Sequence, residues 1–252
     1  GSSVEMAAAL KQLSLSGLGP MQRVAVGLRI AVDVPQQQDL LLRFAGLVGA
    51  WLTHLGAQPD AMRTFEKIPE HVVTDICEVL QLCARAEPQR LLSCPLVSPL
   101  VSNLVCGWLG MRELLTSPFV RYSMAEVLHT FVSIDELSAS RDLRFRQFGA
   151  LMPGQLISLL DANAAEAVQE PLLALYVELG LHTHASAVTD KNSQRHAIMC
   201  VLRSLWRQQH VWAKLQSVAD GDGEVFGEFC ETLVKEAVFL LNDALGRLAD
   251  VR

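Results

Sequence analysis

Apolar residues recur every three or four positions along most of this chain, which is the spacing of one face of an α-helix. The segment 69–87 is the clearest example, because Pro69 suits a first helical turn and Pro88 stops the last one. Its apolar side chains fall on one stripe, and its charged and amide side chains fall elsewhere. The stripe consists of Val72, Val73, Ile76, Val79, Leu80 and Cys83. The pattern predicts one helix between the two prolines.

Similar start and stop signals mark three further segments. Pro35 suits a first helical turn, Ser117 is a natural N-cap before Pro118, and Gly180 suits a helix end. The apolar residues after each start signal again follow helical spacing. The helices predicted from these signals cover residues 35–55, 117–133 and 171–180.

The last quarter of the chain predicts two more helices. Asn192 or Ser193 can cap the first, and Glu224 opens the second, which runs to about Val251. At about 1.5 Å per residue, the second helix is roughly 40 Å long. Its apolar stripe consists of Phe226, Phe229, Leu233, Ala237, Leu240, Ala244 and Leu248. We expect this stripe to be buried, so that Leu240→Ala destabilises the protein by about 2–5 kcal/mol.

Three segments follow the helical pattern less closely. Weaker helical spacing covers residues 96–109 and 141–160. Between Val24 and Val34, apolar residues alternate strictly with other residues, as they do in a strand. No second segment of comparable pattern offers a sheet partner, so we expect residues 24–34 to be helical or irregular.

Helices of ten to twenty residues, joined by short connections that contain Pro and Gly, are typical of antiparallel helical hairpins. We therefore predict an all-α fold, an elongated α-solenoid of irregular armadillo- or HEAT-like hairpins without a strict repeat period. Residues 1–3, Gly-Ser-Ser, have the composition of an expression scar. We expect residues 4–66 to form an N-terminal helical part and residues 67–252 to form the main solenoid.

Charge and hydropathy argue against two classes of partner. The 252 residues include 21 basic and 27 acidic side chains, a net charge of -6, so nucleic acid is not expected to bind. The mean hydropathy is +0.27, yet no apolar run approaches the roughly 20 residues that cross a bilayer core. The sequence also lacks a charged-then-apolar leader. We expect an intracellular monomer that does not enter a membrane.

The cysteines and histidines predict neither a metal nor another cofactor. The six cysteines never form a Cys-x-x-Cys pair and mostly fall on apolar helical faces, so we expect reduced core residues. His182 and His184 lie in a polar segment without the spacing of a metal site. The acidic run 220–231 lacks a calcium-loop glycine, because Val225 stands at that position. These acids instead favour a helix start.

Catalytic motifs are also absent from the sequence. His71 lies one helical turn before Asp75, as in a hydrogen-bonded pair, but no nucleophile motif or Gly-rich phosphate loop accompanies it. Arg141, Arg144 and Arg146 could form a small basic patch, although such arginines more often pair with carboxylates on a solvated helix face. We expect no catalytic residue, and these three arginines are the candidate partner-binding residues.

Residues 190–251 carry the most specific motifs of the chain. One predicted helix holds Lys191, Arg195, His196, Leu205 and Trp206, and the last helix holds Lys235-Glu236, Phe239-Leu240-Leu241 and Asn242-Asp243. With 67–71 and 117–121 upstream, these motifs resemble the core region of the ubiquitin chain elongation factors, a family of U-box ubiquitin-protein transferases. The pair Lys235-Glu236 departs from the family's Asn-Asp.

The resemblance implies an armadillo-like core with protein partners of the ubiquitin conjugation pathway. They are a segregase ATPase of the AAA class, shuttle proteins with ubiquitin-like domains, ubiquitylated substrates, and a ubiquitin-conjugating enzyme that docks on a U-box. We find no U-box in these 252 residues. The resemblance also implies a ubiquitin ligase complex that acts in the degradation of endoplasmic-reticulum proteins, in the cytoplasm and the nucleus.

The leading hypothesis is therefore a helical scaffold that positions ubiquitylated substrate and partners for a U-box outside this segment. A first alternative is a generic armadillo-like adaptor without a ubiquitin role, which successive asparagine ladders would favour. A second alternative is a helical hydrolase, which requires a nucleophile and a base side by side. The sequence contains no sign of either feature.

Overall fold

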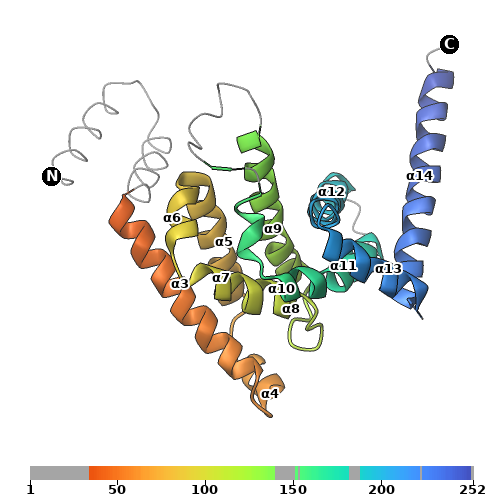
Figure 1. The fold of residues 1–252 in the computed structure, drawn as a ribbon. Coiled ribbons are helices and arrows are strands. Elements are labelled where there is room, and N and C mark those ends of the chain that lie inside the picture. Colours follow the sequence, from red (N-terminus) through yellow and green to blue (C-terminus); the bar gives the residue numbers. More distant parts are fainter. Residues whose placement is uncertain (1–33, 140–150, 153, 182–187, 222, 251–252) are drawn as a thin grey trace, which may run out of the picture.

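The computed structural model describes residues 34–139, 151–152, 154–181, 188–221 and 223–250, and every regular element in these ranges is a helix (Figure 1). This confirms the all-α class. The α-helices are α3 (Pro35–Gly56), α4 (Ala61–Phe65), α5 (His71–Ala86), α6 (Pro88–Ser93), α7 (Val97–Pro99), α8 (Gly107–Leu109), α9 (Pro118–Ala139), α10 (Ala162–Ala167), α11 (Gln169–Leu181), α12 (Val188–Leu205), α13 (Gln209–Asp220) and α14 (Glu224–Asp250). A π-helix, η1 (Leu100–Cys106), and a 3-10 helix, η3 (Ile157–Leu159), complete the set.

The long helices pack side by side in a row that crosses the molecule (Figure 1). Helix α5 lies between α3 and α9, α9 in turn contacts α12 and α11, and α11 contacts α12 and α14. One continuous apolar core runs along this row, from Leu42 in α3 to Phe229 in α14. An elongated solenoid of irregular armadillo- or HEAT-like hairpins, and a boundary near residue 66, stay predictions.

Two glycines allow α3 to lie close against the segment that follows α6. A Cβ atom on Gly46 would lie 2.9 Å from the Cβ atom of Leu96, and one on Gly49 would collide with the side chain of Leu100. Real Cβ atoms do not approach a neighbouring Cβ so closely, so a larger residue would force the two elements apart. The inner face of α3 is therefore packed along its length.

The structure confirms four helices that the sequence predicts. The segments 35–55, 69–87, 171–180 and 224–251 correspond to α3, α5, α11 and α14 within a few residues at each end. These helices begin or end near a proline, a glycine or an acidic start. Such signals act through the local backbone and do not depend on tertiary contacts.

Other boundaries were wrong, because tertiary contacts extend or interrupt the local pattern. Helix α9 continues to Ala139 instead of ending near Ser133, and α12 begins at Val188, so Asn192 and Ser193 lie inside it and do not cap it. Residues 96–109 are helical but contain the π-helix η1. Of the strand-like segment 24–34, all but Val34 lies outside the described residues.

The predicted helix 141–160 was also wrong over its described part. Residues 140–150 and 153 lie outside the described residues, and residues 154–160 form a turn with the short 3-10 helix η3. Asp135 of α9 holds this turn, because its carboxylate accepts the backbone N–H groups of Leu156 (3.1 Å) and Ile157 (2.9 Å). Gly154 precedes them with a φ of 86°, a conformation that glycine adopts readily.

Candidate protein-interaction surfaces

The sequence predicts three arginines as partner-binding residues. Arg141, Arg144 and Arg146 lie outside the described residues, so their role stays a prediction. The other candidate surfaces lie on the described helices. Among them, no helix is both long enough and apolar enough to cross a bilayer.

The histidine and cysteine positions give no reaction centre in the described part of the chain. No group of three or more metal-binding side chains comes together there. His71 and Asp75 are not joined by a hydrogen bond; instead, the hydroxyl of Thr74 donates to the backbone carbonyl of His71 (3.0 Å). His182 and His184 lie outside the described residues.

The cysteines are free thiols, as the sequence predicts. Cys77, Cys83 and Cys106 are buried, and Cys94, Cys200 and Cys230 are partly buried. Burial raises the pKa of Cys77 and of Cys106 to about 12, so both thiols stay protonated at neutral pH. A protonated, buried thiol is a poor nucleophile, which fits a structural role.

The motif residues of α12 take part in packing. Leu205 is fully buried, and the indole N–H of Trp206 donates to the side-chain oxygen of Gln169 in α11 (3.1 Å). Arg195 is only 7% exposed, and its guanidinium pairs with Glu236 of α14 (3.1 Å). The side chain of Lys191 is not described. These residues join α12 to α11 and α14, and they form no open site.

Sequence reasoning did not identify the role of Glu236. This carboxylate lies on the same face of α14 as Phe229 and Leu233. It forms an ion pair with Arg195 and accepts a hydrogen bond from the hydroxyl of Tyr176 (2.6 Å). An acidic residue on an otherwise apolar stripe is a detectable signal. Its partners, however, lie 41 and 60 positions away, and no local spacing identifies them.

The C-terminal half of α14 is an exposed apolar segment. Beyond Glu236, every described side chain of α14, up to Arg247, is exposed. Leu240 is 53% exposed and Phe239 is 69% exposed, so the predicted burial of Leu240 was wrong. The apolar stripe is present, but only its first part, through Phe226, Phe229 and Leu233, contacts the core.

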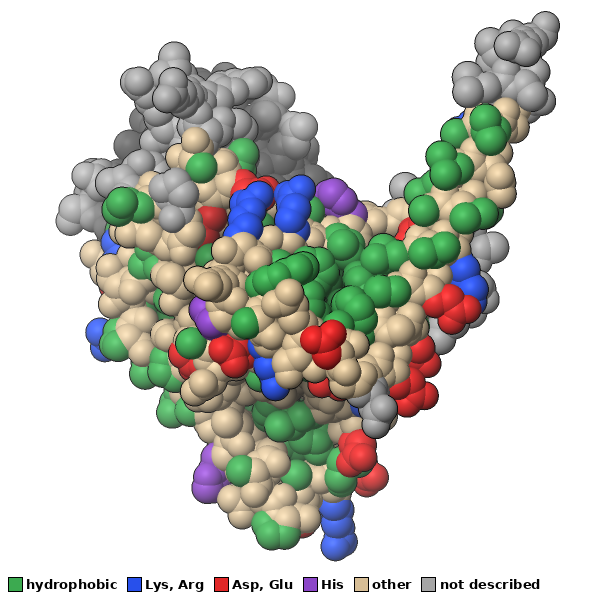
Figure 2. All heavy atoms as spheres, turned by 45° about the vertical axis from the view of Figure 1, so that its right-hand side comes forward, with side chains coloured by type: hydrophobic (Ala, Val, Ile, Leu, Met, Phe, Trp, Pro, Cys, Tyr) green, Lys and Arg blue, Asp and Glu red, His purple; other side chains and the backbone are tan. Residues whose placement is uncertain are grey.

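From Val234 onward, α14 carries exposed apolar side chains on more than one face. The side chains that are more than half exposed are Val234, Val238, Phe239, Leu240, Leu241 and Leu245. Figure 1 shows the C-terminal part of α14 standing clear of the other helices, and Figure 2 shows hydrophobic side chains along it and over the surface where it leaves the rest of the molecule. A helix that is apolar on several sides is typical of a buried environment.

Helix α3 carries a second exposed apolar stripe, on the other side of the molecule (Figure 1). Leu40, Phe44, Leu47 and Trp51 follow a four-three-four spacing, and each is at least half exposed. Because the inner face of α3 is packed along its length, this stripe is a single face. It differs in that respect from the distal half of α14.

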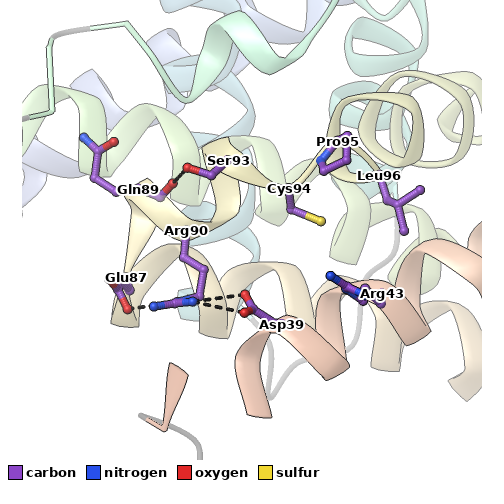
Figure 3. Close-up of a pocket in the computed structure, with 9 residues that line it drawn as sticks. All are labelled: Asp39, Arg43, Glu87, Gln89, Arg90, Ser93, Cys94, Pro95 and Leu96. Carbon is purple, nitrogen blue, oxygen red and sulfur yellow. Dashed lines mark hydrogen bonds and ion pairs between the residues drawn. The ribbon is translucent and has the colours of Figure 1, made fainter. Parts of the chain in front are cut away.

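A groove of about 630 Å³ lies beside this stripe, between α3 and α6. Figure 3 shows the guanidinium of Arg90 between Glu87 and Asp39, with N–O distances of 3.1 Å to each. The hydrogen bonds that Arg90 donates to the carboxylates of Asp39 and Glu87 raise its pKa above the ordinary value. This ion-pair network ties α6 to α3, and no group activated for a reaction lines the groove.

The described part of the chain is thus an all-α protein with two exposed apolar surfaces, on α3 and α14. A family model described as "Ubiquitin elongating factor core" matches residues 5–252. The chain therefore belongs to the ubiquitin elongating factor core family, as its motifs indicate.

Two curated relatives agree with this family. The chain is 26% identical over 216 residues to "Probable ubiquitin conjugation factor E4" of Arabidopsis thaliana, which covers 84% of this chain and 19% of the relative. It is 22% identical over 198 residues to "Ubiquitin conjugation factor E4" of Schizosaccharomyces pombe, which covers 76% of this chain and 18% of the relative. The chain thus spans about a fifth of the length of these relatives. No solved structure matches it.

Proposed function

We propose that this chain is a helical scaffold of ubiquitin chain elongation, which holds partner proteins in place while bonds are made elsewhere. Membership of the ubiquitin elongating factor core family supports a role in this pathway. Its two relatives are ubiquitin conjugation factors by name. A scaffold contributes to the rate by orienting reactants, which needs a rigid body and contact surfaces but no nucleophile.

The projecting half of α14 is the observation that carries this proposal. Six large apolar side chains between Val234 and Leu245 face water, which is costly unless another protein surface covers them. Because Phe239 and Leu240 lie off the face that the other four side chains share, a flat surface would leave part of them exposed. The partner surface that fits is an apolar groove between helices, with few charges at its centre.

The partners and the place of action belong to the same proposal. We propose that the scaffold brings a segregase ATPase of the AAA class, shuttle proteins with ubiquitin-like domains and ubiquitylated substrates close to a ubiquitin-conjugating enzyme on a U-box outside these 252 residues. The degradation of endoplasmic-reticulum proteins, in the cytoplasm and the nucleus, is the corresponding setting. Armadillo-like stacking of the helices would give the rigidity that this role requires.

The test places charges on the exposed half of α14 in the full product of the gene. Val238→Asp together with Leu241→Asp introduces two carboxylates into the proposed contact. Asn242→Asp adds a carboxylate at an exposed polar position on the same helix and is the matched control. Because none of these three side chains contributes to the core, both the double variant and the control are expected to fold.

The readout is the rate of chain extension on a ubiquitin-fusion substrate, with purified activating and conjugating enzymes and the segregase ATPase. The double variant is expected to bind the partner about 10- to 100-fold more weakly, the loss typical of two contact residues at the centre of an interface. Its rate of chain extension is expected to fall for this reason. The control is expected to behave like the unmodified protein. Equal rates for the double variant and the control contradict the proposal. Lost binding of the segregase with an unchanged rate would favour the adaptor without a ubiquitin role.

A further inference from the structure

The root of α14 is held by a compact polar cluster that joins three helices. Glu236 of α14 forms an ion pair with Arg195 of α12 (3.1 Å) and accepts a hydrogen bond from the hydroxyl of Tyr176 of α11 (2.6 Å). The guanidinium of Arg195 also stacks on the ring of Tyr176, 4.1 Å from its centroid. We call Arg195, Tyr176 and Glu236 the α14 clamp.

The clamp is enclosed by the protein. Arg195 is only 7% exposed, and its Nε and Nη2 atoms are buried without a hydrogen-bond partner. A Cβ atom on Gly180 of α11 would lie 3.1 Å from Nη2 of Arg195, so the backbone of α11 closes one side of the guanidinium. Phe229 packs edge-on against Tyr176, with ring centroids 5.1 Å apart, so an apolar contact of α14 adjoins the clamp.

Glu236 also marks the place where α14 leaves the body. Helix α14 packs on α11 and, to a smaller extent, on α13. Glu236 is partly buried, whereas every described side chain after it on α14 is exposed. The direction of the projecting half is therefore determined by the contacts at and before Glu236. Among these contacts, the clamp has the strictest geometry, because it combines a charge pair with a stacked ring.

A buried ion pair of this kind contributes little net stability, because the loss of hydration offsets much of its attraction. Its effect lies in selecting one arrangement, since any displacement of Glu236 leaves the charge of Arg195 buried without a counter-charge. Apolar contacts such as those of Phe229 tolerate small rotations better than a charge pair does. The clamp is therefore better suited to fixing the angle at which α14 projects than to holding α14 on the other helices.

We propose that Arg195, Tyr176 and Glu236 are positioning residues, which fix the angle at which α14 projects and so determine where its apolar half meets a partner. This inference rests on the proposed function of α14 as a contact surface. The clamp acts through α14, and none of its three residues touches the partner.

The experiment measures the direction of α14 by pulsed electron paramagnetic resonance between two spin labels. Glu78→Cys on the exposed face of α5 and Gly246→Cys near the end of α14 take the labels. Cys94, Cys200 and Cys230 are replaced by serine, while the buried thiols of the remaining cysteines stay unlabelled. The variants are Glu236→Gln and the double change Arg195→Met with Glu236→Leu.

The matched control is Glu231→Gln, which breaks an exposed ion pair with Lys235 (2.7 Å) on the same helix. The parent and this control are expected to give one narrow distance distribution. Glu236→Gln and the double variant are expected to lose it, and the double variant is expected to keep the parent's melting temperature because it leaves no buried charge. This separation of angle from stability would not follow from a merely structural role.

A narrow distribution that persists in both clamp variants overturns the inference. The two proposals fail separately, because the distance measurement needs no partner. If the distances broaden while chain extension keeps its rate, the clamp stands and the proposed function of α14 falls. If the distances stay fixed in the clamp variants while Val238→Asp with Leu241→Asp slows extension, the positioning role of the clamp is contradicted and the contact surface on α14 is supported.

Discussion

Among the described residues, the two buried arginines, Arg121 and Arg195, are each paired with a glutamate of another helix, and the pair formed by Arg121 and Glu178 is the more enclosed. Arg121 of α9 is 2% exposed; its Nε atom donates to the backbone carbonyl of Leu115 (3.0 Å), and its Nη2 atom lies 2.5 Å from Glu178 of α11. One carboxylate oxygen of Glu178 is buried without another partner. The pair thus joins α9 to α11, with the guanidinium inside the protein and the carboxylate only partly exposed.

Arg121→Leu is expected to destabilise the protein by about 3–5 kcal/mol, because the carboxylate of Glu178 loses its counter-charge in a poorly hydrated position. Replacing Glu178 by leucine as well is expected to restore much of this loss. Urea unfolding measures both. Arg203→Leu, which removes an exposed pair with Glu136, is the control and is expected to cost at most about 1 kcal/mol. Equal effects of Arg121→Leu and the control would show that the buried pair is not structural.

His129 of α9 gives the stability a dependence on pH. Burial lowers the pKa of His129 from 6.5, and the nearby His196 and Arg85 lower it further, against the opposite effect of Glu126 and Glu136. The unfolded chain therefore binds a proton that the folded protein does not accept. The contribution of His129 is fully present above pH 6.5 and is lost as the pH falls through its lowered pKa.

Melting temperatures at about pH 7.5 and about pH 5.5 test this dependence, since an ordinary histidine titrates between them. The parent is expected to lose more stability on acidification than His129→Gln, in which this proton-binding site is removed. The histidines that do not neighbour His129 contribute equally to both proteins. A pH dependence that is unchanged in His129→Gln would contradict the assignment.

At the scale of the element, α9 and α14 show what a helical apolar pattern does and does not predict. Both helices carry stripes with the spacing of a buried face. Leu128 of α9 is fully buried between neighbouring helices, whereas Leu240 of α14 is 53% exposed. The pattern is a property of one helix, but burial needs a second element in contact with it. The existence of both helices was therefore predictable, and the burial of Leu240 was not.

Leu128→Ala is expected to cost about 2–5 kcal/mol, because it leaves a cavity in a packed core. Leu240→Ala is expected to stay within about 0.5 kcal/mol, as is usual for a side chain without core contacts. The measurement is urea unfolding of residues 1–252 at low protein concentration, where no partner covers α14. A large loss for Leu240→Ala would show that the distal half of α14 is packed after all.

At the scale of the whole molecule, the sequence predicts the helical class and the family but not the way the helices meet. Prolines, glycines and apolar spacing act locally, and they located α3, α5, α11 and α14. The contacts that join distant segments, such as Asp135 with the turn at 154–160 or Arg195 with Glu236, connect residues with no shared local pattern. The exposure of the distal half of α14 could not be predicted for the same reason, because it depends on whether another helix packs against it.

An isolated scaffold should compete with the complete protein for partners. Residues 1–252 alone are expected to transfer no ubiquitin when mixed with activating and conjugating enzymes, because the bond-forming step is proposed to occur on a U-box outside them. Added in excess to the full gene product, they are expected to slow chain extension, since their α14 occupies the same partner groove. The same residues with Val238→Asp and Leu241→Asp are expected to leave the rate unchanged. Transfer by residues 1–252 alone would contradict the scaffold assignment, and equal inhibition by both forms would exclude α14 as the contact.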